Sequence, residues 1–156
     1  MAVSELNNLP VWEKMETIDL SEMSSIKLMN RIDTKYIASS DHLVPILTMA
    51  LDKYRVQSID GIRVARYDTL YFDTPDLKMY TMHHNRKMRR QKVRTRTYVE
   101  SDLSFLEVKN KTNKGRTKKK RIAIDRQTFF NFQNNAQAME FLGERSMFPA
   151  GELTPN

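Results

Sequence analysis

The chain has 156 residues, of which 40% are hydrophobic and 29% charged, and its formal net charge is +7. This length and composition predict one globular domain over residues 1–156. The absence of cysteine excludes disulfides and cysteine-ligated zinc or iron–sulfur sites. No stretch approaches the roughly 20 apolar residues of a membrane-spanning helix, and the N-terminus has no apolar signal core, so we expect a cytoplasmic location.

Composition also argues against common nucleotide-binding motifs. Phosphate-binding loops and dinucleotide folds need glycines at fixed spacing, but the four glycines here show no such pattern. His83 and His84 are adjacent in the sequence. Because neighbouring residues point to different sides of a helix or strand, both are predicted to be ordinary surface residues.

The N-terminal part predicts an arm, a strand and a helix. Residues 1–18 are predicted to form an N-terminal packing arm, anchored by residues 9–12. In residues 26–36, mostly apolar residues occupy the even-numbered positions and mostly charged residues the odd-numbered ones. This alternation predicts a strand. Ser40-Asp41 is a suitable N-cap for a helix over residues 41–54.

The next segment predicts a hairpin followed by a short helix. Asp60-Gly61 is a typical turn dipeptide, and it separates two predicted strands over residues 55–59 and 63–73. Residues 77–85 suit one short amphipathic helix. The aromatic residues assigned to core packing are Tyr36, Tyr71 and Phe72.

Residues 86–121 carry most of the positive charge, with 15 of the chain's 26 lysines and arginines against three acidic residues. In residues 90–98 a cation recurs at every second position, which is the period of a strand. The alternation repeats in residues 105–111 and 118–124. These segments therefore predict three antiparallel strands with one packed face and one cationic face.

The C-terminal part predicts two helices and a loop. Asp125 is a suitable cap for a helix over residues 125–133, and residues 135–144 suit a second helix. The residues from Pro149 onward are predicted to be a loop. The order of strand, helix, several strands and helix indicates an α+β fold with an antiparallel sheet and flanking helices.

A cationic sheet face is open to three interpretations. Like charges on neighbouring strands repel, and a convex face relieves that repulsion by simple solvation. A concave face would instead bind a polyanion. Nucleic acid is the less favoured ligand, because Tyr98 and Phe105 are the only nearby aromatic residues on which bases could stack.

Five motifs in series resemble those of VTC-type polyphosphate polymerase domains, which belong to the triphosphate tunnel metalloenzyme superfamily together with CYTH-type triphosphatases. The motifs are RIDTKY at 31–36, LYFDT at 70–74, KVRTRTY at 92–98, FLEVK at 105–109 and KKR at 119–121. The resemblance implies an antiparallel β-barrel. Its lumen would hold basic residues for ATP or polyphosphate and acidic residues for Mn²⁺ or Mg²⁺.

The resemblance also implies roles for individual residues. The implied phosphate-binding residues are Arg31, Lys35, Lys92, Arg94, Arg96, Lys109, Lys119 and Arg121, and the alternation of the strands adds Arg90 and Lys111. Of these, Arg94, Arg96 and Lys109 are the predicted catalytic residues. Glu107 and Asp33 are the predicted metal ligands, and an ion pair with Arg31 or Lys35 is the alternative role for Asp33. The opening motif has Arg-x-Asp-x-Lys where CYTH relatives carry Glu-x-Glu-x-Lys, which favours a polymerase over a hydrolase.

The activity expected from the resemblance is transfer of the γ-phosphate of ATP to a growing phosphate chain. The family's later strands are not recognisable after Ile124, so we expect an incomplete barrel. The isolated chain is then expected to be weak or inactive unless a second chain or another copy completes the barrel. The alternative is a module that binds polyphosphate or another polyanion without turnover.

Overall fold

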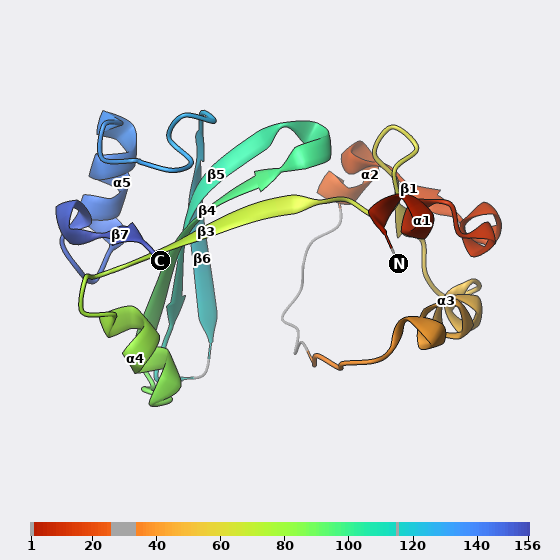
Figure 1. Ribbon diagram of the computed structural model, residues 1–156, viewed down its shortest axis with the longest axis horizontal. Helices are drawn as coiled ribbons and strands as arrows, with labels where there is room; N and C mark the ends of the chain where they lie inside the picture. The colour runs from red at the N-terminus through yellow and green to blue at the C-terminus, as the bar shows by residue number, and fades with distance from the viewer. Residues whose placement is uncertain (1, 26–33, 115) are drawn as a thin grey trace. The chain divides into compact units, whose positions relative to one another are not determined.

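The computed structural model describes residues 2–25, 34–114 and 116–156. The chain forms two compact units, Met1–Ala65 and Arg66–Asn156 (Figure 1). Within the described ranges, none of the helices combines the length and the apolar character needed to cross a membrane.

The first unit consists of short elements around a small buried cluster. They are α1 (Val3–Asn7), η1 (Pro10–Lys14), β1 (Thr17–Ile18), α2 (Leu20–Ser25), η2 (Ser40–His42), α3 (Leu43–Ala50) and β2 (Val56–Gln57). Val11, Trp12 and Met15 are buried, and Leu47 of α3 packs against them. The expected packing of Val11 and Trp12 is therefore confirmed, and α3 lies within the predicted helix.

The predicted hairpin around Asp60-Gly61 is only partly correct. Both turn residues have positive φ angles, 48° for Asp60 and 81° for Gly61, as a tight hairpin turn requires. However, this turn closes only an isolated bridge between Ile59 and Ile62. The strand before the turn, β2, pairs in parallel with β1 instead.

The strand predicted over residues 26–36 is not supported by its described part. Residues 26–33 lie outside the described residues, and residues 34–39 contain no helix or strand. Tyr36 is 87% exposed and Ile37 is fully exposed. The assignment of Tyr36 to the core was therefore wrong: an alternating pattern predicts burial only where a partner element covers the apolar side.

The second unit is built on one antiparallel sheet. Its elements are β3 (Tyr67–Asp73), α4 (Lys78–His84), β4 (Arg90–Tyr98), η3 (Val99–Ser101), β5 (Leu103–Lys111), β6 (Thr117–Ile124), α5 (Ala136–Arg145), η4 (Ala150–Glu152) and β7 (Thr154–Pro155). The strand order is β6-β5-β4-β3-β7, and all neighbours are antiparallel. The predicted α+β class, the three basic strands and the helix at α4 are confirmed.

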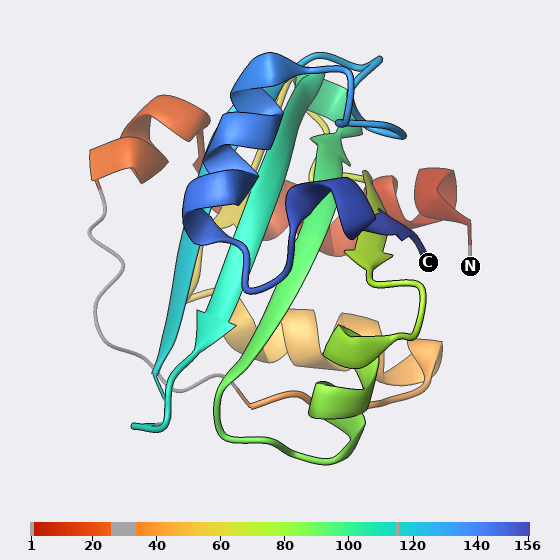
Figure 2. The same cartoon turned by 90° about the vertical axis from the view of Figure 1, so that its left-hand side faces the viewer.

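One face of this sheet forms the core of the unit. Val93, Leu106 and Val108 are almost completely buried, and they join one cluster with Leu142 of α5. Figure 2 shows α5 lying across the strands on this face. Fully burying a side chain such as Leu142 contributes about 2 kcal/mol, so this face holds the unit together. Asn135 begins α5 by accepting a hydrogen bond from the backbone N–H of Ala138 at 2.9 Å.

The segments on either side of α5 differ from expectation. Residues 126–130 form turns and not a helix, although Asp125 does accept the hydrogen bond from Thr128 N–H that a cap would make. The tail is not a plain loop, because β7 pairs with β3 through Thr154 and Pro155. Both differences arise from contacts with the sheet, which a local pattern does not report.

The described sheet is open, whereas an incomplete barrel was predicted. Its outer strands are β6 and β7, and they do not pair with each other in the part of the chain that the structure describes. Closure would need further strands between these two edges. The antiparallel sheet and the flanking helices are present, but the barrel is not confirmed.

Candidate functional site

The face of the sheet opposite α5 carries a dense array of positive charges, which we call the cationic face. The strand registers place on it Arg90, Lys92, Arg94 and Arg96 from β4, Lys109 and Lys111 from β5, and Lys119 and Arg121 from β6. Glu107 lies on the same face. The parity prediction for these positions is therefore confirmed.

The alternation of the three basic strands explains why the charges share one face. Between the cations stand residues such as Val93, Thr95 and Val108, which are buried on the α5 side. Because successive side chains point to opposite faces, burial of these residues on the α5 side places the alternating cations on the other face. Lys118 and Lys120 have the opposite parity and pair with Asn110 and Val108, so they lie outside the cationic face as predicted.

Three lysines form a line across the sheet. Lys92 lies opposite Lys109 on the neighbouring strand, and Lys109 lies opposite Lys119 on the next. Side chains directly opposite each other start about 5 Å apart, so the positive charges of these lysines repel one another. This line is therefore a strain on the fold that a bound anion would relieve.

Glu107 provides the counter-charge at the centre of the face. It is fully buried, and its Oε2 atom lies 2.6 Å from Arg94 Nη2 and 2.7 Å from Arg94 Nε. Its Oε1 atom lies 3.2 Å from Lys119 Nζ. Burial alone would raise the pKa of Glu107, but the hydrogen bonds and charges of Arg94 and Lys119 outweigh it and lower the pKa. The carboxylate is therefore ionised and already shared by two cations.

Tyr71 of β3 extends this cluster. Its hydroxyl accepts a hydrogen bond from Arg94 Nη1 at 3.4 Å, and Lys92 Nζ lies 5.7 Å from the centre of its ring. Burial raises the pKa of Tyr71, but the hydrogen bond from Arg94 and the nearby positive charges together lower it. Tyr71 was assigned to the core and is instead 39% exposed on the cationic face; Phe72 is in the core as expected.

Aromatic rings hold two further arginines in position. The guanidinium of Arg96 lies 4.1 Å from the ring centre of Tyr67, and its Nε donates to Thr69 Oγ1 at 2.9 Å. The guanidinium of Arg121 lies 4.0 Å from the ring centre of Phe105. Contacts of this kind orient a guanidinium without neutralising it, so both arginines keep their charge available to an anion.

Six of the eight cations form no ion pair with the acidic residues that the structure describes. They are Arg90, Lys92, Arg96, Lys109, Lys111 and Arg121. Burial lowers the pKa of Lys109, and the charges of Arg94 and Lys119 lower it further against an opposing effect of Glu107. A group whose charged form is disfavoured in this way gains most from an incoming anion.

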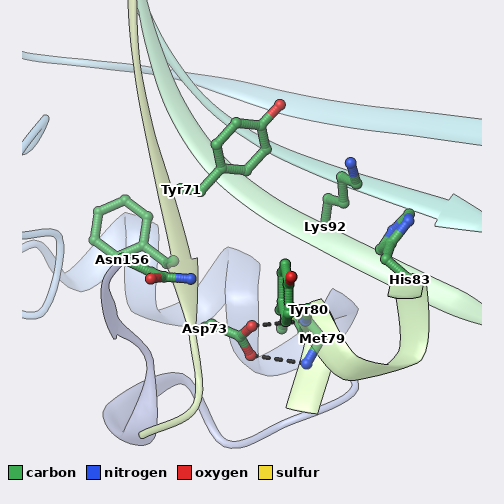
Figure 3. A pocket seen from close by; sticks show the side chains of 8 residues that line it. Tyr71, Asp73, Met79, Tyr80, His83, Lys92 and Asn156 are labelled. Carbon is green, nitrogen blue, oxygen red and sulfur yellow. Dashed lines mark hydrogen bonds between the residues drawn. The ribbon is translucent and has the colours of Figure 1, made fainter. Parts of the chain in front are cut away.

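A pocket of about 260 Å³ opens beside the cationic face, between α4 and the ends of β3 and β4 (Figure 3). Its walls come from Tyr71, Phe72 and Asp73 of β3 and from Met79, Tyr80 and His83 of α4. Lys92 and Asn156 complete the lining. The two oxygens of Asp73 accept from the backbone N–H groups of Met79 and Tyr80, both at 2.8 Å, which fixes the start of α4 against the sheet.

His83 was predicted to be an ordinary surface residue, but it lines this pocket. Burial lowers its pKa, and the positive charges of Lys92, Arg90 and Lys111 add to that effect. Its imidazole is therefore neutral at neutral pH. No local sequence signal distinguishes it from His84, since the difference depends on which side of α4 meets the sheet.

The structure does not test the roles predicted for the residues of the opening motif. Arg31 and Asp33 lie outside the described residues, so their predicted roles stay predictions. Lys35 is exposed on a segment without regular structure in the first unit. Residues that the sequence interpretation missed are Tyr67, Thr69 and Tyr71, which share one parity on β3 and could have been found by extending the alternation to that strand.

The described residues offer little to a divalent metal. In the ranges 2–25, 34–114 and 116–156, no three or more histidine or acidic side chains gather where they could hold an ion. Glu107 is the predicted ligand within these ranges, but both of its oxygens are already engaged by cations. A metal cage made by this chain's described residues does not fit.

Comparison with protein families gives one assignment. The family model described as VTC domain matches residues 30–150, which includes the whole cationic face and, apart from Asn156, the residues that line the pocket beside it. A search of curated proteins found no match.

Proposed function

Because the chain belongs to the VTC-domain family, a family related to polyphosphate, we propose that its cationic face binds the phosphate chain of ATP and of inorganic polyphosphate. The observation that carries the proposal is the arrangement of eight cations from three neighbouring strands around a single carboxylate. An excess of charge this large on one face attracts polyanions.

The types of cation suit phosphate recognition. Arginine can hold two phosphate oxygens at once through its planar guanidinium, whereas lysine acts as a mobile point charge. Arg96 and Arg121 are oriented by aromatic rings, and Lys109 lies on the middle strand, opposite Lys92 and Lys119. A linear phosphate chain running over the sheet would meet both kinds of cation along its length.

The proposed reaction is transfer of the γ-phosphoryl group of ATP to the end of a phosphate chain. A terminal oxygen of the acceptor chain forms a bond to the γ-phosphorus, while the bond from that phosphorus to the β,γ-bridging oxygen breaks and ADP leaves. Such transfer depends mainly on positioning and on stabilising charge on the phosphate oxygens. Arg96 and Lys109 are assigned to that stabilisation, and Arg94, held by Glu107, to positioning.

Two further parts of the proposal concern what surrounds the face. We assign the open sheet to one wall of a phosphate-binding tunnel, whose opposite wall would come from other strands or from a second chain. Mn²⁺ or Mg²⁺ is proposed to arrive with the triphosphate, because Mg²⁺ is commonly held by substrate phosphates and only one or two carboxylates. The ion would neutralise part of the phosphate charge.

The binding proposal is tested with two double variants, one that removes two lysines from β5 and one that removes two lysines from β6. Lys109→Ala with Lys111→Ala removes two charges from the cationic face, and Lys118→Ala with Lys120→Ala removes two charges from outside it. Affinity for tripolyphosphate, measured by titration calorimetry, is expected to fall at least tenfold for the first pair, about 1.4 kcal/mol, and little for the second. Equal losses for the two pairs would refute a face-specific site.

Turnover is tested separately. The protein is incubated with ATP and Mn²⁺, and long phosphate chains are sought by gel electrophoresis, with the Lys109→Ala, Lys111→Ala variant as the negative control. A second function, binding without turnover, is favoured by the engagement of Glu107 by Arg94 and Lys119, which leaves it poorly placed as a metal ligand. Tight tripolyphosphate binding with no chain product, even with an added barrel-completing chain, would support this second function.

A further inference from the structure

We propose that the pocket between α4 and the strands β3 and β4 is a subsite for the base of a nucleoside triphosphate whose phosphates lie on the cationic face. The inference rests on the proposed function and extends it. It assigns to the pocket a chemical group, the nucleobase, that a pure phosphate chain does not contain.

The pocket and the cationic face are continuous. Lys92 belongs to the row of cations on β4 and also lines the pocket. Tyr71 likewise lines the pocket while its hydroxyl accepts a hydrogen bond from Arg94. Lys92 Nζ and the Tyr71 ring centre are 5.7 Å apart, so the pocket and the cationic face share two neighbouring residues.

The walls suit a flat and partly apolar group. Phe72 and Met79 are buried in the pocket floor, with exposed fractions of 3% and 2%. Tyr71 and Tyr80 present accessible rings, 39% and 59% exposed, from the strand and the helix. Figure 3 shows Tyr71 on β3, Tyr80 on α4 and Lys92 on β4 in the lining of the pocket. Aromatic side chains are the platforms on which nucleobases stack.

The electrostatics do not oppose such a ligand. Asp73 is the acidic side chain in the lining, and its oxygens are occupied by the backbone N–H groups that begin α4. His83 is neutral at neutral pH because burial and the neighbouring cations lower its pKa. The pocket therefore does not repel a nucleobase, while Lys92 at the edge of the pocket attracts the phosphates.

The volume of the pocket limits which part of a nucleotide can enter it. Pockets for drug-sized molecules occupy about 300–1,000 Å³, and this one measures about 260 Å³. It is therefore suited to one fused ring and not to a complete nucleotide. An inorganic phosphate chain is hydrophilic throughout and would gain nothing from the apolar walls.

The test compares ATP with tripolyphosphate, which shares the phosphates but has no base. Tyr80→Ala removes one ring from the pocket, and Phe130→Ala removes a similarly exposed ring, 67%, from outside it. By titration calorimetry, Tyr80→Ala is expected to weaken ATP binding about tenfold and to leave tripolyphosphate binding unchanged, as expected for loss of one stacking contact. Phe130→Ala is expected to change neither.

A second measurement uses the unaltered protein. Met79 lines the pocket, so ATP is expected to shift the NMR signal of its methyl group by the ring current of the base, and tripolyphosphate is expected to leave that signal in place. The base subsite would be overturned if Tyr80→Ala changed the affinities for ATP and tripolyphosphate equally, or changed neither. It would also be overturned if the two ligands shifted the Met79 signal alike. Failure of the unaltered protein to bind tripolyphosphate would instead overturn the proposed function itself.

Discussion

Arg94 and Glu107 lie directly opposite each other on neighbouring strands, and two nitrogens of the guanidinium contact the same carboxylate oxygen at 2.6 and 2.7 Å. Both side chains are buried, with Arg94 8% exposed and Glu107 fully covered. The other oxygen of Glu107 contacts Lys119. The pair therefore anchors the centre of the cationic face while the cations around it stay available.

Replacing Glu107 by glutamine should destabilise the second unit strongly. Glu107→Gln leaves the buried charge of Arg94 without its partner, and breaking a buried ion pair from one side costs about 3 kcal/mol. Urea unfolding monitored by circular dichroism would measure the loss. As a control, Arg94→Met combined with Glu107→Leu should recover much of the stability, since no buried charge is left alone. A double variant less stable than Glu107→Gln would contradict this account.

Acid should weaken the fold through the same carboxylate. The pKa of Glu107 lies below its ordinary value of 4.5 in the folded protein, so the ionised form is favoured by folding. Its contribution is complete above that ordinary value and disappears as the pH falls through the lowered, folded-state pKa. The unfolding free energy of the wild type should therefore drop more steeply below pH 4.5 than that of Glu107→Gln. Parallel pH profiles for the two proteins would show that Glu107 does not drive the acid sensitivity.

Salt should reveal how many cations contact the bound chain. Neutralising phosphates with lysine and arginine releases counterions, so the logarithm of affinity falls linearly with the logarithm of salt concentration. By analogy with single-stranded nucleic acids, each contacting cation contributes roughly 0.7 to that slope. For a long polyphosphate, Lys109→Ala with Lys111→Ala should reduce the slope by about 1.4, while Lys118→Ala with Lys120→Ala should leave it unchanged. The measurement is a fluorescence titration at several salt concentrations.

Phosphate binding should raise the pKa of His83. In the unliganded protein, burial and the charges of Lys92, Arg90 and Lys111 lower it. An anion on the cationic face offsets those charges and so favours the imidazolium form. An NMR titration of the imidazole protons with and without tripolyphosphate would measure the change. An unchanged or lowered pKa would place the anion away from Lys92.

Binding and turnover should respond differently to metal removal. In the proposed site the described residues would bind phosphate through cations, and they provide no carboxylate cluster for a metal. Tripolyphosphate should therefore still bind in EDTA with less than about a threefold change in affinity, which corresponds to about 0.6 kcal/mol. Synthesis of phosphate chains from ATP should stop in EDTA and recover with added Mn²⁺. Loss of binding itself in EDTA would show that a metal held by the protein is required.

The basic strands were predictable because their pattern is local. Strand β4 alternates cations with residues that pack, and the cations are Arg90, Lys92, Arg94 and Arg96. Burial of the packing residues on one face of the sheet therefore places the cations on the other face. Tyr71 was misassigned because an aromatic residue suits a core and an anion site equally well in sequence. Its placement depends on the pairing of β3 with β4, which puts it opposite Arg94.

The amino-acid sequence by itself determined the α+β class, the three basic strands, the shared face of their cations and the family, since each depends on alternation or on motifs within one segment. Only the tertiary structure decided that Glu107 is shared by Arg94 and Lys119, that His83 and not His84 lines a pocket, and that β7 pairs with β3. These features depend on distances between residues far apart in the chain. Such distances are set by the packing of whole elements, which no local period encodes.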